Sequence, residues 1–264
     1  HILLTFERTI TAPQDQKDFF QTLVIVGAGP TGVELAGAFA EIRKMILPKD
    51  YPRIDFSRFK IYLIEGSQNT LNNMSELSRK TSRRYLEKMG VKILTSTYVK
   101  DYDGRTLTLS NGDTIGAMTV IWAAGVTGNK IEGLPREAEG PGNRIRVDRY
   151  NKVVGLEDVF AVGDIAYMET PKYPKGHPQV ATVDINQARN LARNFARVEK
   201  GQAQKSYEYR DLGSMATIGR NKAVVDLPFF RFKGCTAWLV WMFLHLMLIL
   251  SVRNRLVIFI NWAW

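Results

Sequence analysis

The sequence predicts an α/β fold, and three observations carry that prediction. A short β-prone run, residues 22–26, leads directly into a glycine-rich turn and a helical pattern. A second run, residues 60–64, is followed directly by an acidic residue. One more helical pattern comes next, and further β-prone runs then follow up to residue 122. This order is that of a nucleotide-binding α/β domain.

The composition is that of an ordinary globular protein. Of the 264 residues, 45% are hydrophobic and 23% are charged, which argues against disorder. The net charge of +10 favours an anionic partner: nucleic acid, an anionic membrane surface or a phosphate-bearing ligand. No basic-aromatic motif of a known nucleic-acid-binding module is present, so we expect no nucleic-acid partner. The single cysteine, Cys235, excludes internal disulfides and a cysteine-rich metal site, and no metal is predicted.

The most informative stretch is VGAGPTGVELAGAFAEIRKM. Its first glycines stand in the G-x-G-x-x-G spacing, between the strand at residues 22–26 and a helix, which is the context that this motif requires. Such glycines allow a tight turn, close approach of the backbone to a pyrophosphate and close packing of helix on strand, while the helix N-terminus binds the phosphates. We therefore predict a phosphate loop formed by Gly27, Ala28, Gly29, Pro30, Thr31 and Gly32. Small residues on one face of the helix, among them Gly37, are expected to press it close to the sheet.

The second strand supplies an acid for the ribose. Glu65 directly follows residues 60–64, and a carboxylate at this position binds ribose hydroxyls. The gap from Gly32 exceeds the usual ~20 residues, because residues 46–59, with two prolines, are expected to form an inserted loop. Since a carboxylate repels a 2′-phosphate, NADH is predicted in preference to NADPH. A solvated glutamate at the end of a strand is the alternative.

The other elements follow in chain order. A helix is predicted to begin at the N-cap Ser75 and to stop at Gly90. Strands are then predicted within three runs, residues 91–102, 106–115 and 118–126. Beyond Gly125, an alternating strand and a turn are predicted, followed by a second strand at residues 158–162.

The order VGAGPTGVELAG, IWAAGV and VFAVGDIA resembles that of flavoproteins with two dinucleotide-binding folds. The tail, GSMATIGRNKAVVDL followed by AWLVWMFLHL and RNRLVIFINW, is similar specifically to type II NADH dehydrogenases. The resemblance covers nearly the whole chain and implies tandem Rossmann-like folds, with an FAD fold split around an NADH fold. The implied parts are the end of a first FAD segment (1–20), the NADH-binding domain (21–125), a second FAD segment (126–200) and a C-terminal region with a membrane-docking helix (201–264).

The resemblance also implies FAD as a cofactor beside NADH. In this family, the glycine motif that holds the FAD pyrophosphate would precede His1, and the sequence stops at Trp264 within an apolar stretch. We therefore expect a chain truncated at both ends that binds FAD poorly or not at all by itself.

Residue roles come from the same resemblance. Glu34 matches a glutamate near the point where nicotinamide meets flavin and is the predicted catalytic residue, orienting groups or handling protons; a carboxylate favoured by the helix dipole is the alternative. Asp164 matches the acid that binds the flavin ribityl chain, with a turn aspartate as the alternative. The other implied cofactor-binding residues are Ala124, Gly125, Gly163, Ala181 and Thr182.

The segment ATVDINQ, residues 181–187, corresponds to the family segment at the pyrimidine end of the flavin, which opens a helix beside the quinone. It departs from the family pattern twice. Thr182 stands where glutamine is common, and Asp184 stands where a small apolar residue is common. A carboxylate at Asp184 facing the flavin is expected to disfavour the reduced anion.

The apolar run at residues 235–250 is shorter than the ~20 residues that cross a bilayer. No acidic residue follows Asp226, whereas arginine, lysine and tryptophan punctuate the tail. This composition favours a helix lying in the membrane interface at anionic headgroups, with a buried core helix as the alternative.

The resemblance to type II NADH dehydrogenases thus implies an enzyme, an NADH:quinone oxidoreductase that passes a hydride from NADH to FAD and two electrons to menaquinone or ubiquinone without pumping protons. It is expected at the cytoplasmic face of the inner or plasma membrane as a peripheral protein, and a homodimer is left open. The alternatives are a soluble NADH-dependent flavoprotein reductase with a non-quinone acceptor and a non-enzymatic, NAD-binding, membrane-associated protein.

Overall fold

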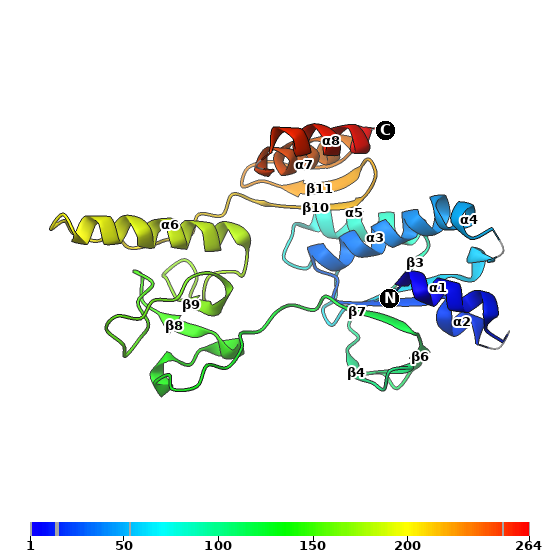
Figure 1. Cartoon of the computed structure of the whole chain (residues 1–264), viewed down its shortest axis with the longest axis horizontal. Helices are drawn as coiled ribbons and strands as arrows, with labels where there is room; N and C mark the ends of the chain where they lie inside the picture. The colour runs from blue at the N-terminus through cyan, green and yellow to red at the C-terminus, as the bar shows by residue number, and fades with distance from the viewer. Residues whose placement is uncertain (1, 14–15, 53, 250, 264) are drawn as a thin grey trace. The chain divides into compact units, whose positions relative to one another are not determined.

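The computed structural model describes residues 2–13, 16–52, 54–249 and 251–263. The chain divides into two compact units, one spanning residues 1–124 and 212–264 and the other residues 125–211 (Figure 1). The predicted α/β class is confirmed. The assignment of residues 1–20 and 126–200 to an FAD fold stays a prediction.

A four-stranded parallel sheet in the order β3-β2-β1-β7 forms the centre of the first unit. The strand β1 (Thr22–Val26) pairs with β2 (Lys60–Ile64) on one side and β7 (Thr119–Trp122) on the other, and β2 pairs with β3 (Val91–Leu94). Every residue of β1 is buried, as expected for a central strand that is covered on both faces.

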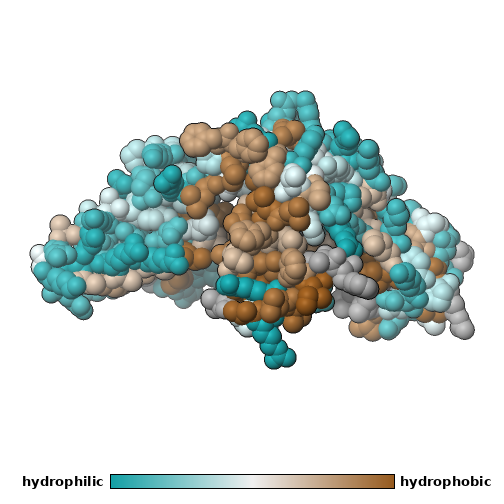
Figure 2. All heavy atoms as spheres, turned by 90° about the horizontal axis from the view of Figure 1, so that it is seen from above, coloured by the Kyte–Doolittle hydropathy of each residue, from teal (hydrophilic) through white to brown (hydrophobic). Residues whose placement is uncertain are grey.

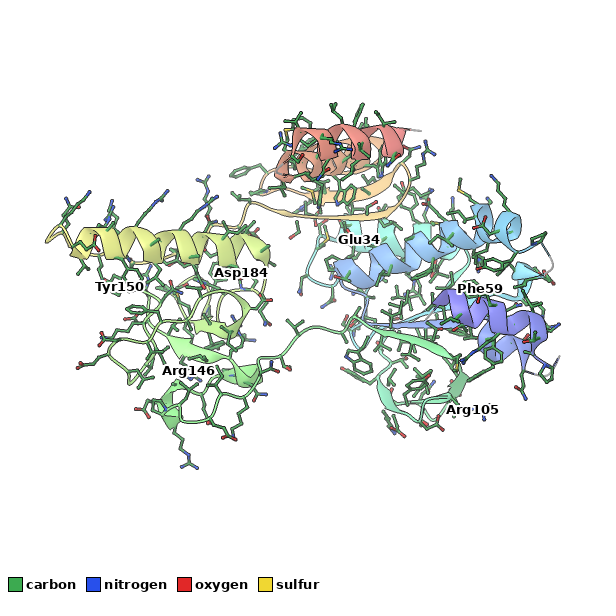
Figure 3. All side chains as sticks on the ribbon, in the orientation of Figure 1. Glu34, Phe59, Arg105, Arg146, Tyr150 and Asp184 are labelled. Atoms are coloured by element: carbon green, nitrogen blue, oxygen red, sulfur yellow. The ribbon has the colours of Figure 1, made fainter. Side chains whose placement is uncertain are left out.

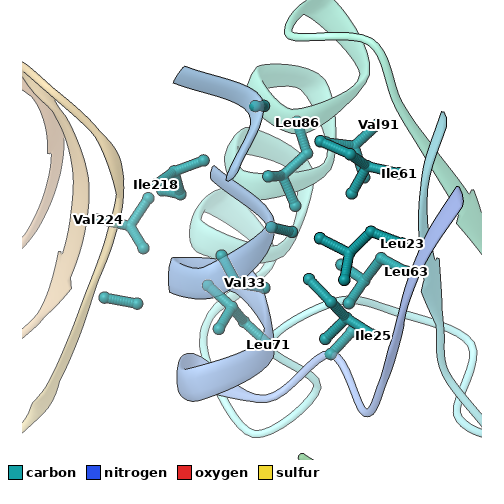
Figure 4. Close-up of a cluster of buried hydrophobic side chains, with 14 of the residues drawn as sticks. Leu23, Ile25, Val33, Ile61, Leu63, Leu71, Leu86, Val91, Ile218 and Val224 are labelled. Atoms are coloured by element: carbon teal, nitrogen blue, oxygen red, sulfur yellow. The ribbon is translucent and has the colours of Figure 1, made fainter. Parts of the chain in front are cut away.

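The helix α3 (Pro30–Met45) packs between this sheet and an antiparallel sheet from the C-terminal region. The second sheet contains β10 (Ser214–Gly219), β11 (Lys222–Asp226) and β12 (Arg231–Gly234). One core joins the two sheets through α3, with Leu23 and Ile61 on one side and Ile218 and Val224 on the other (Figure 4).

Gly37 faces the second sheet and not the parallel sheet that its position in a strand–turn–helix unit predicted. A Cβ on Gly37 would lie 1.9 Å from the carbonyl oxygen of Ile218 in β10. The helix can approach β10 this closely only because the residue is glycine.

The helix α5 (Glu76–Lys88) begins as predicted, with the Ser75 side chain accepting a hydrogen bond from the Ser78 backbone N–H. The carboxylate of Asp226 at the end of β11 adds a second cap. It accepts hydrogen bonds from the Ser75 N–H at 2.6 Å and from the Ser75 and Ser78 hydroxyls at 2.8 Å. The C-terminal sheet is therefore fixed to α5 as well as to α3.

Two expectations for the first unit need correction. The predicted strand run at residues 91–102 is broken into β3 and β4, because Ser96 turns the chain with a φ of +52°. The predicted loop at residues 46–59 contains two short helices and is anchored by the buried side chains of Leu47, Phe56 and Phe59. The remaining elements of this unit outside the C-terminal helices are α1 (Ile2–Thr11), α2 (Lys17–Phe20), α4 (Leu47–Asp50), η1 (Phe56–Arg58), β4 (Val99–Tyr102), β5 (Thr106–Leu109) and β6 (Thr114–Gly116).

The C-terminal region ends in two helices, α7 (Cys235–Leu248) and α8 (Val252–Ala263). Arg255 of α8 donates hydrogen bonds to the carbonyls of Met247 and Ile249, which satisfies the end of α7. Within the part of the chain that the structure describes, no helix combines the length and the apolar character needed to cross a membrane. Leu250 and Trp264 lie outside the described residues.

The second unit contains a parallel strand pair, β8 (Ile145–Val147) with β9 (Ala166–Met168), and the long helix α6 (Ala181–Val198). Its single-turn helices are η2 (Arg136–Ala138), η3 (Pro141–Asn143) and η4 (Gly163–Ile165). The strand predicted at residues 158–162 is wrong, since the segment forms one isolated bridge, between Phe160 and Lys152. Its partner segment is also too short for a ladder, because Lys152 bridges to Phe160 while the next residue, Val153, bridges to Val147 instead.

Candidate functional site

The predicted phosphate loop, residues 27–32, lies where β1 ends and α3 begins. Gly27 has a φ of +100°, and a Cβ there would lie 2.5 Å from the carbonyl oxygen of Ala123. A Cβ on Gly32 would lie 1.8 Å from the carbonyl oxygen of Gly27, whereas a Cβ on Gly29 would meet nothing within 4 Å. Gly27 and Gly32 therefore serve the turn and the packing, and Gly29 leaves open space at the start of α3.

Glu65 lies directly beside this loop. One of its carboxylate oxygens accepts a hydrogen bond from the Ala28 N–H at 2.6 Å, and the other accepts one from the Ser67 N–H at 2.7 Å. The carboxylate is thus held at the carboxyl edge of the parallel sheet, between β2 and the start of α3. This is the edge at which open α/β sheets bind their ligands.

Ala124 and Gly125 follow β7 and mark the boundary between the units. Ala124 ends the stretch that belongs to the first unit, and Gly125, with a φ of +100°, begins the second. A positive φ at this position turns the chain as it leaves the sheet.

Glu34 lies on α3, two residues past the predicted phosphate loop, and lines a pocket of about 290 Å³ (Figure 3). Its carboxylate accepts a hydrogen bond from the Thr217 N–H of β10 at 3.3 Å. Burial raises the pKa of Glu34, against the weaker opposing effects of this hydrogen bond and of the imidazole of His245. The other residues that line the pocket are Ala38, Glu41, Thr217, Gly219, Arg220, Trp238, Trp241 and Asn261.

The pocket joins residues that the sequence left without a role. Trp241 contributes one wall and stacks on His245, whose Nδ1 donates a hydrogen bond to the Trp241 carbonyl oxygen at 2.8 Å. The Arg220 N–H donates to the Glu41 carboxylate at 2.8 Å, and Lys222 lies 3.6 Å from the same carboxylate. The tryptophans that punctuate the apolar tail are the one signal in the sequence for this wall, because its partners on α3 are distant in sequence.

A second cluster lies in the second unit, at the N-terminus of α6. Gly163, with a φ of +79°, donates its N–H to the Gln187 side chain at 2.8 Å. Asp184 lies beside Gly163, and burial raises the pKa of Asp184, helped by the Asp164 carboxylate and opposed by Arg144.

Thr182 and Ala181 open α6 as predicted. The Thr182 hydroxyl lies 3.4 Å from that of Tyr209. Arg144, which no sequence pattern indicated, donates hydrogen bonds to the carbonyls of Asp164 and Ala166 at 2.9 and 2.6 Å. It thereby holds the turn that carries the aspartate.

Two family matches cover most of the chain. Residues 5–188 match the pyridine nucleotide-disulphide oxidoreductase family, and residues 212–264 match the NDH2 C-terminal domain. The structure resembles that of NDH2 from Plasmodium falciparum in complex with NADH, with a TM-score of 0.87 over 98% of this chain and 69% of that one. At 20% sequence identity this likeness shows the fold alone.

Relatives of known activity are similar along the chain. The type II NADH:quinone oxidoreductase Ndh of Mycobacterium tuberculosis is 30% identical, over 99% of this chain and 58% of the relative. The mitochondrial internal alternative NAD(P)H-ubiquinone oxidoreductase A1 of Arabidopsis thaliana is also 30% identical, over 94% of this chain and 52% of the relative. The chain thus spans a little more than half the length of these relatives. From the family matches and these relatives we conclude that the chain belongs to the pyridine nucleotide-disulphide oxidoreductase family and, within it, to the type II NADH dehydrogenases.

Proposed function

We propose that this chain is the NADH-binding and acceptor-facing part of an NADH:quinone oxidoreductase that does not pump protons. The observation that carries the proposal is the double use of α3. Its N-terminus forms the phosphate loop, and one turn later it presents Glu34 to a pocket lined by tryptophans of the C-terminal region. One rigid helix thereby links a donor site to an acceptor site.

The residues of the phosphate loop fit NADH. Open space beside Gly29 supports a close approach of the pyrophosphate, because a Cβ there would meet no atom of another part of the chain within 4 Å. The N-cap of α3 is this glycine, so no side chain of its own occupies the first N–H groups of the helix. The Glu65 carboxylate would accept hydrogen bonds from the ribose hydroxyls and would repel the 2′-phosphate of NADPH.

The residues near Asp164 fit part of an FAD site. Buried polar atoms of Asp184 and Gln187 have no hydrogen-bond partner among the described residues, as expected where a polar ligand would complete the cluster. We assign Gly163, Asp164, Ala181 and Thr182 to the flavin. When bound, FAD supplies the two-electron chemistry that links NADH oxidation to quinone reduction.

Glu34 would act on protons. Its raised pKa keeps more of the carboxyl protonated near neutral pH than is usual for glutamate. The oxygen that does not accept from Thr217 can hold this proton in the pocket, where an acceptor that takes two electrons also needs protons. The imidazole of His245 is held by its hydrogen bond to Trp241. It lies close enough to Glu34 for a positive charge on the ring to lower the pKa of the Glu34 carboxyl.

The C-terminal helices would hold the protein on the membrane at its lipid-soluble acceptor. Hydrophobic atoms gather over α7 and α8 in the view of Figure 2. The exposed large apolar residues there are Leu239, Phe243, Leu244, Met247, Leu248, Val252, Leu256, Val257, Phe259 and Ile260. Exposed apolar area of this extent on paired helices supports docking in one leaflet. The cytoplasmic face of the inner or plasma membrane is the side that we propose for it.

The test is an anaerobic NADH titration of the full-length, flavin-loaded protein, followed by a quinone. Bleaching of the flavin absorbance by NADH and its recovery with menaquinone or ubiquinone analogues would support the proposal and identify the quinone. Bleaching that only a water-soluble acceptor reverses would favour the soluble reductase, and an absence of bleaching would favour an NAD-binding protein without catalysis. Sedimentation of the same protein decides whether it is a homodimer.

A further inference from the structure

The carboxyl edge of the parallel sheet presents its strand ends in the order in which a dinucleotide carries its groups. The predicted phosphate loop follows β1, and Glu65 follows β2. The strand β2 pairs with β1 on one side and with β3 on the other. The adenine of a dinucleotide is attached to the ribose on the side away from the pyrophosphate. A pyrophosphate at β1 and a ribose at β2 therefore place the adenine near the end of β3.

The segment just beyond β3 is tied to the segment that carries Glu65. The Ser96 N–H donates a hydrogen bond to the Ser67 carbonyl oxygen at 2.8 Å. The Thr97 N–H donates one to the Glu65 carbonyl oxygen at 3.0 Å. The backbone of the next residue, Tyr98, is therefore held beside the ribose acid.

Tyr98 is an exposed aromatic residue in a fixed position. Its N–H donates a hydrogen bond to the Ser110 hydroxyl at 3.0 Å, and its carbonyl oxygen accepts one from the Ser110 N–H at 2.8 Å. The ring lies against the backbone of Gly66, where a Cβ would be 2.3 Å from the ring carbon Cε1 and 2.8 Å from Cδ1. Even so, Tyr98 is 65% exposed. Most of this aromatic surface is open, next to the residue that follows Glu65.

Core packing does not account for the placement of this ring. Among the residues that the structure describes, the core cluster that includes Leu107 takes in Val99 but not Tyr98. A ring in water gains little from burial, whereas a base stacked on it removes apolar surface of both partners from water. The open surface of Tyr98 thus suits a flat aromatic ligand.

We propose that Tyr98 binds the adenine of NADH by stacking, beside the ribose acid Glu65. The inference rests on the proposed function for its ligand and adds the residue that recognises the base. All the groups that carry it, from the predicted phosphate loop to Tyr98, belong to the first unit. Tyr98 is a binding residue for the half of the dinucleotide that takes no part in hydride transfer.

The test is isothermal titration calorimetry of the full-length, flavin-loaded protein with ADP-ribose, which has the adenosine and the pyrophosphate but no nicotinamide to reduce the flavin. Tyr98→Ala should weaken ADP-ribose binding roughly 5- to 150-fold, the loss expected for one stacked base. Tyr98→Phe keeps the ring and should bind like the parent protein, whereas Tyr98→Leu keeps an apolar cover on Gly66 and should bind as weakly as Tyr98→Ala. The matched control is Phe229→Ala, which removes a fully exposed aromatic residue between β11 and β12 and should change nothing.

Anaerobic reduction of the flavin by reduced nicotinamide mononucleotide, which has no adenosine, separates stacking from a general distortion of the site. Its second-order rate constant should be the same for Tyr98→Ala and the parent protein, whereas the rate constant for NADH should fall. Equal falls with both donors would overturn the proposal, as would a Tyr98→Phe variant that binds ADP-ribose as weakly as Tyr98→Ala.

Glu65→Ala distinguishes a failure of this inference from a failure of the proposed function. ADP-ribose affinity that is lowered in Glu65→Ala but unchanged in Tyr98→Ala would overturn the stacking alone and leave the NADH site in place. ADP-ribose affinity that is unchanged in both variants would overturn the NADH site together with the stacking.

Discussion

Replacing Glu65 by alanine should separate the two nicotinamide dinucleotides. The carboxylate lies at the phosphate loop, where it accepts hydrogen bonds from the N–H groups of Ala28 and Ser67. A hydrogen bond to a charged group contributes about 1.5–3 kcal/mol, so losing one ribose contact should weaken NADH binding by a factor of roughly 10 to 150. NADPH should gain affinity, because the charge that repels its 2′-phosphate is gone.

Isothermal titration calorimetry with NADH and NADPH measures both effects on this chain, since the loop and Glu65 belong to one unit. Glu65→Gln keeps an acceptor but removes the charge, so it should lose less NADH affinity and still gain NADPH affinity. Glu87→Ala removes an exposed carboxylate of α5 and should change neither dissociation constant. If Glu65→Ala bound NADH within twofold of the parent protein while remaining folded by circular dichroism, the carboxylate would not be the ribose ligand.

Three further changes test other parts of the structure. Gly37→Ala should lower the free energy of unfolding by about 1–3 kcal/mol, because its Cβ would collide with the Ile218 carbonyl; a melting temperature equal to that of the parent would contradict this packing. Asp184→Asn should raise the melting temperature at pH 7, because the raised pKa of Asp184 means that the folded state disfavours the ionised carboxylate. The stability that the parent protein loses in this way grows as pH rises above about 3.8. The advantage of the variant in melting temperature should therefore vanish at lower pH. His177→Leu should flatten the fall in melting temperature between pH 7 and pH 5. Burial lowers the pKa of this enclosed histidine, so the unfolded chain takes up the proton first as pH drops below 6.5. An unchanged slope would show that other groups control the pH dependence of the melting temperature.

Features encoded by neighbouring residues could be predicted from the sequence. The phosphate loop and the cap at Ser75 depend on contacts within a few positions, and Glu65 follows from the strand that precedes it. The strand expected at residues 158–162 depended instead on a partner, and a β-prone run without one does not form a ladder. The sequence also could not indicate that the Thr217 N–H would bond to Glu34. The two residues are 183 positions apart, and nothing in the sequence near either one reveals the contact.

That long-range contact also has a consequence for synthesis. At about 5–20 residues per second, roughly 10 to 40 s separate the emergence of Glu34 from that of Thr217 on the ribosome. Throughout this interval the side of α3 that will meet β10 has no cover, and the parallel sheet beneath it is complete only after β7 (Thr119–Trp122) has emerged, about halfway through. The nascent first unit is therefore exposed to aggregation until its last strands arrive.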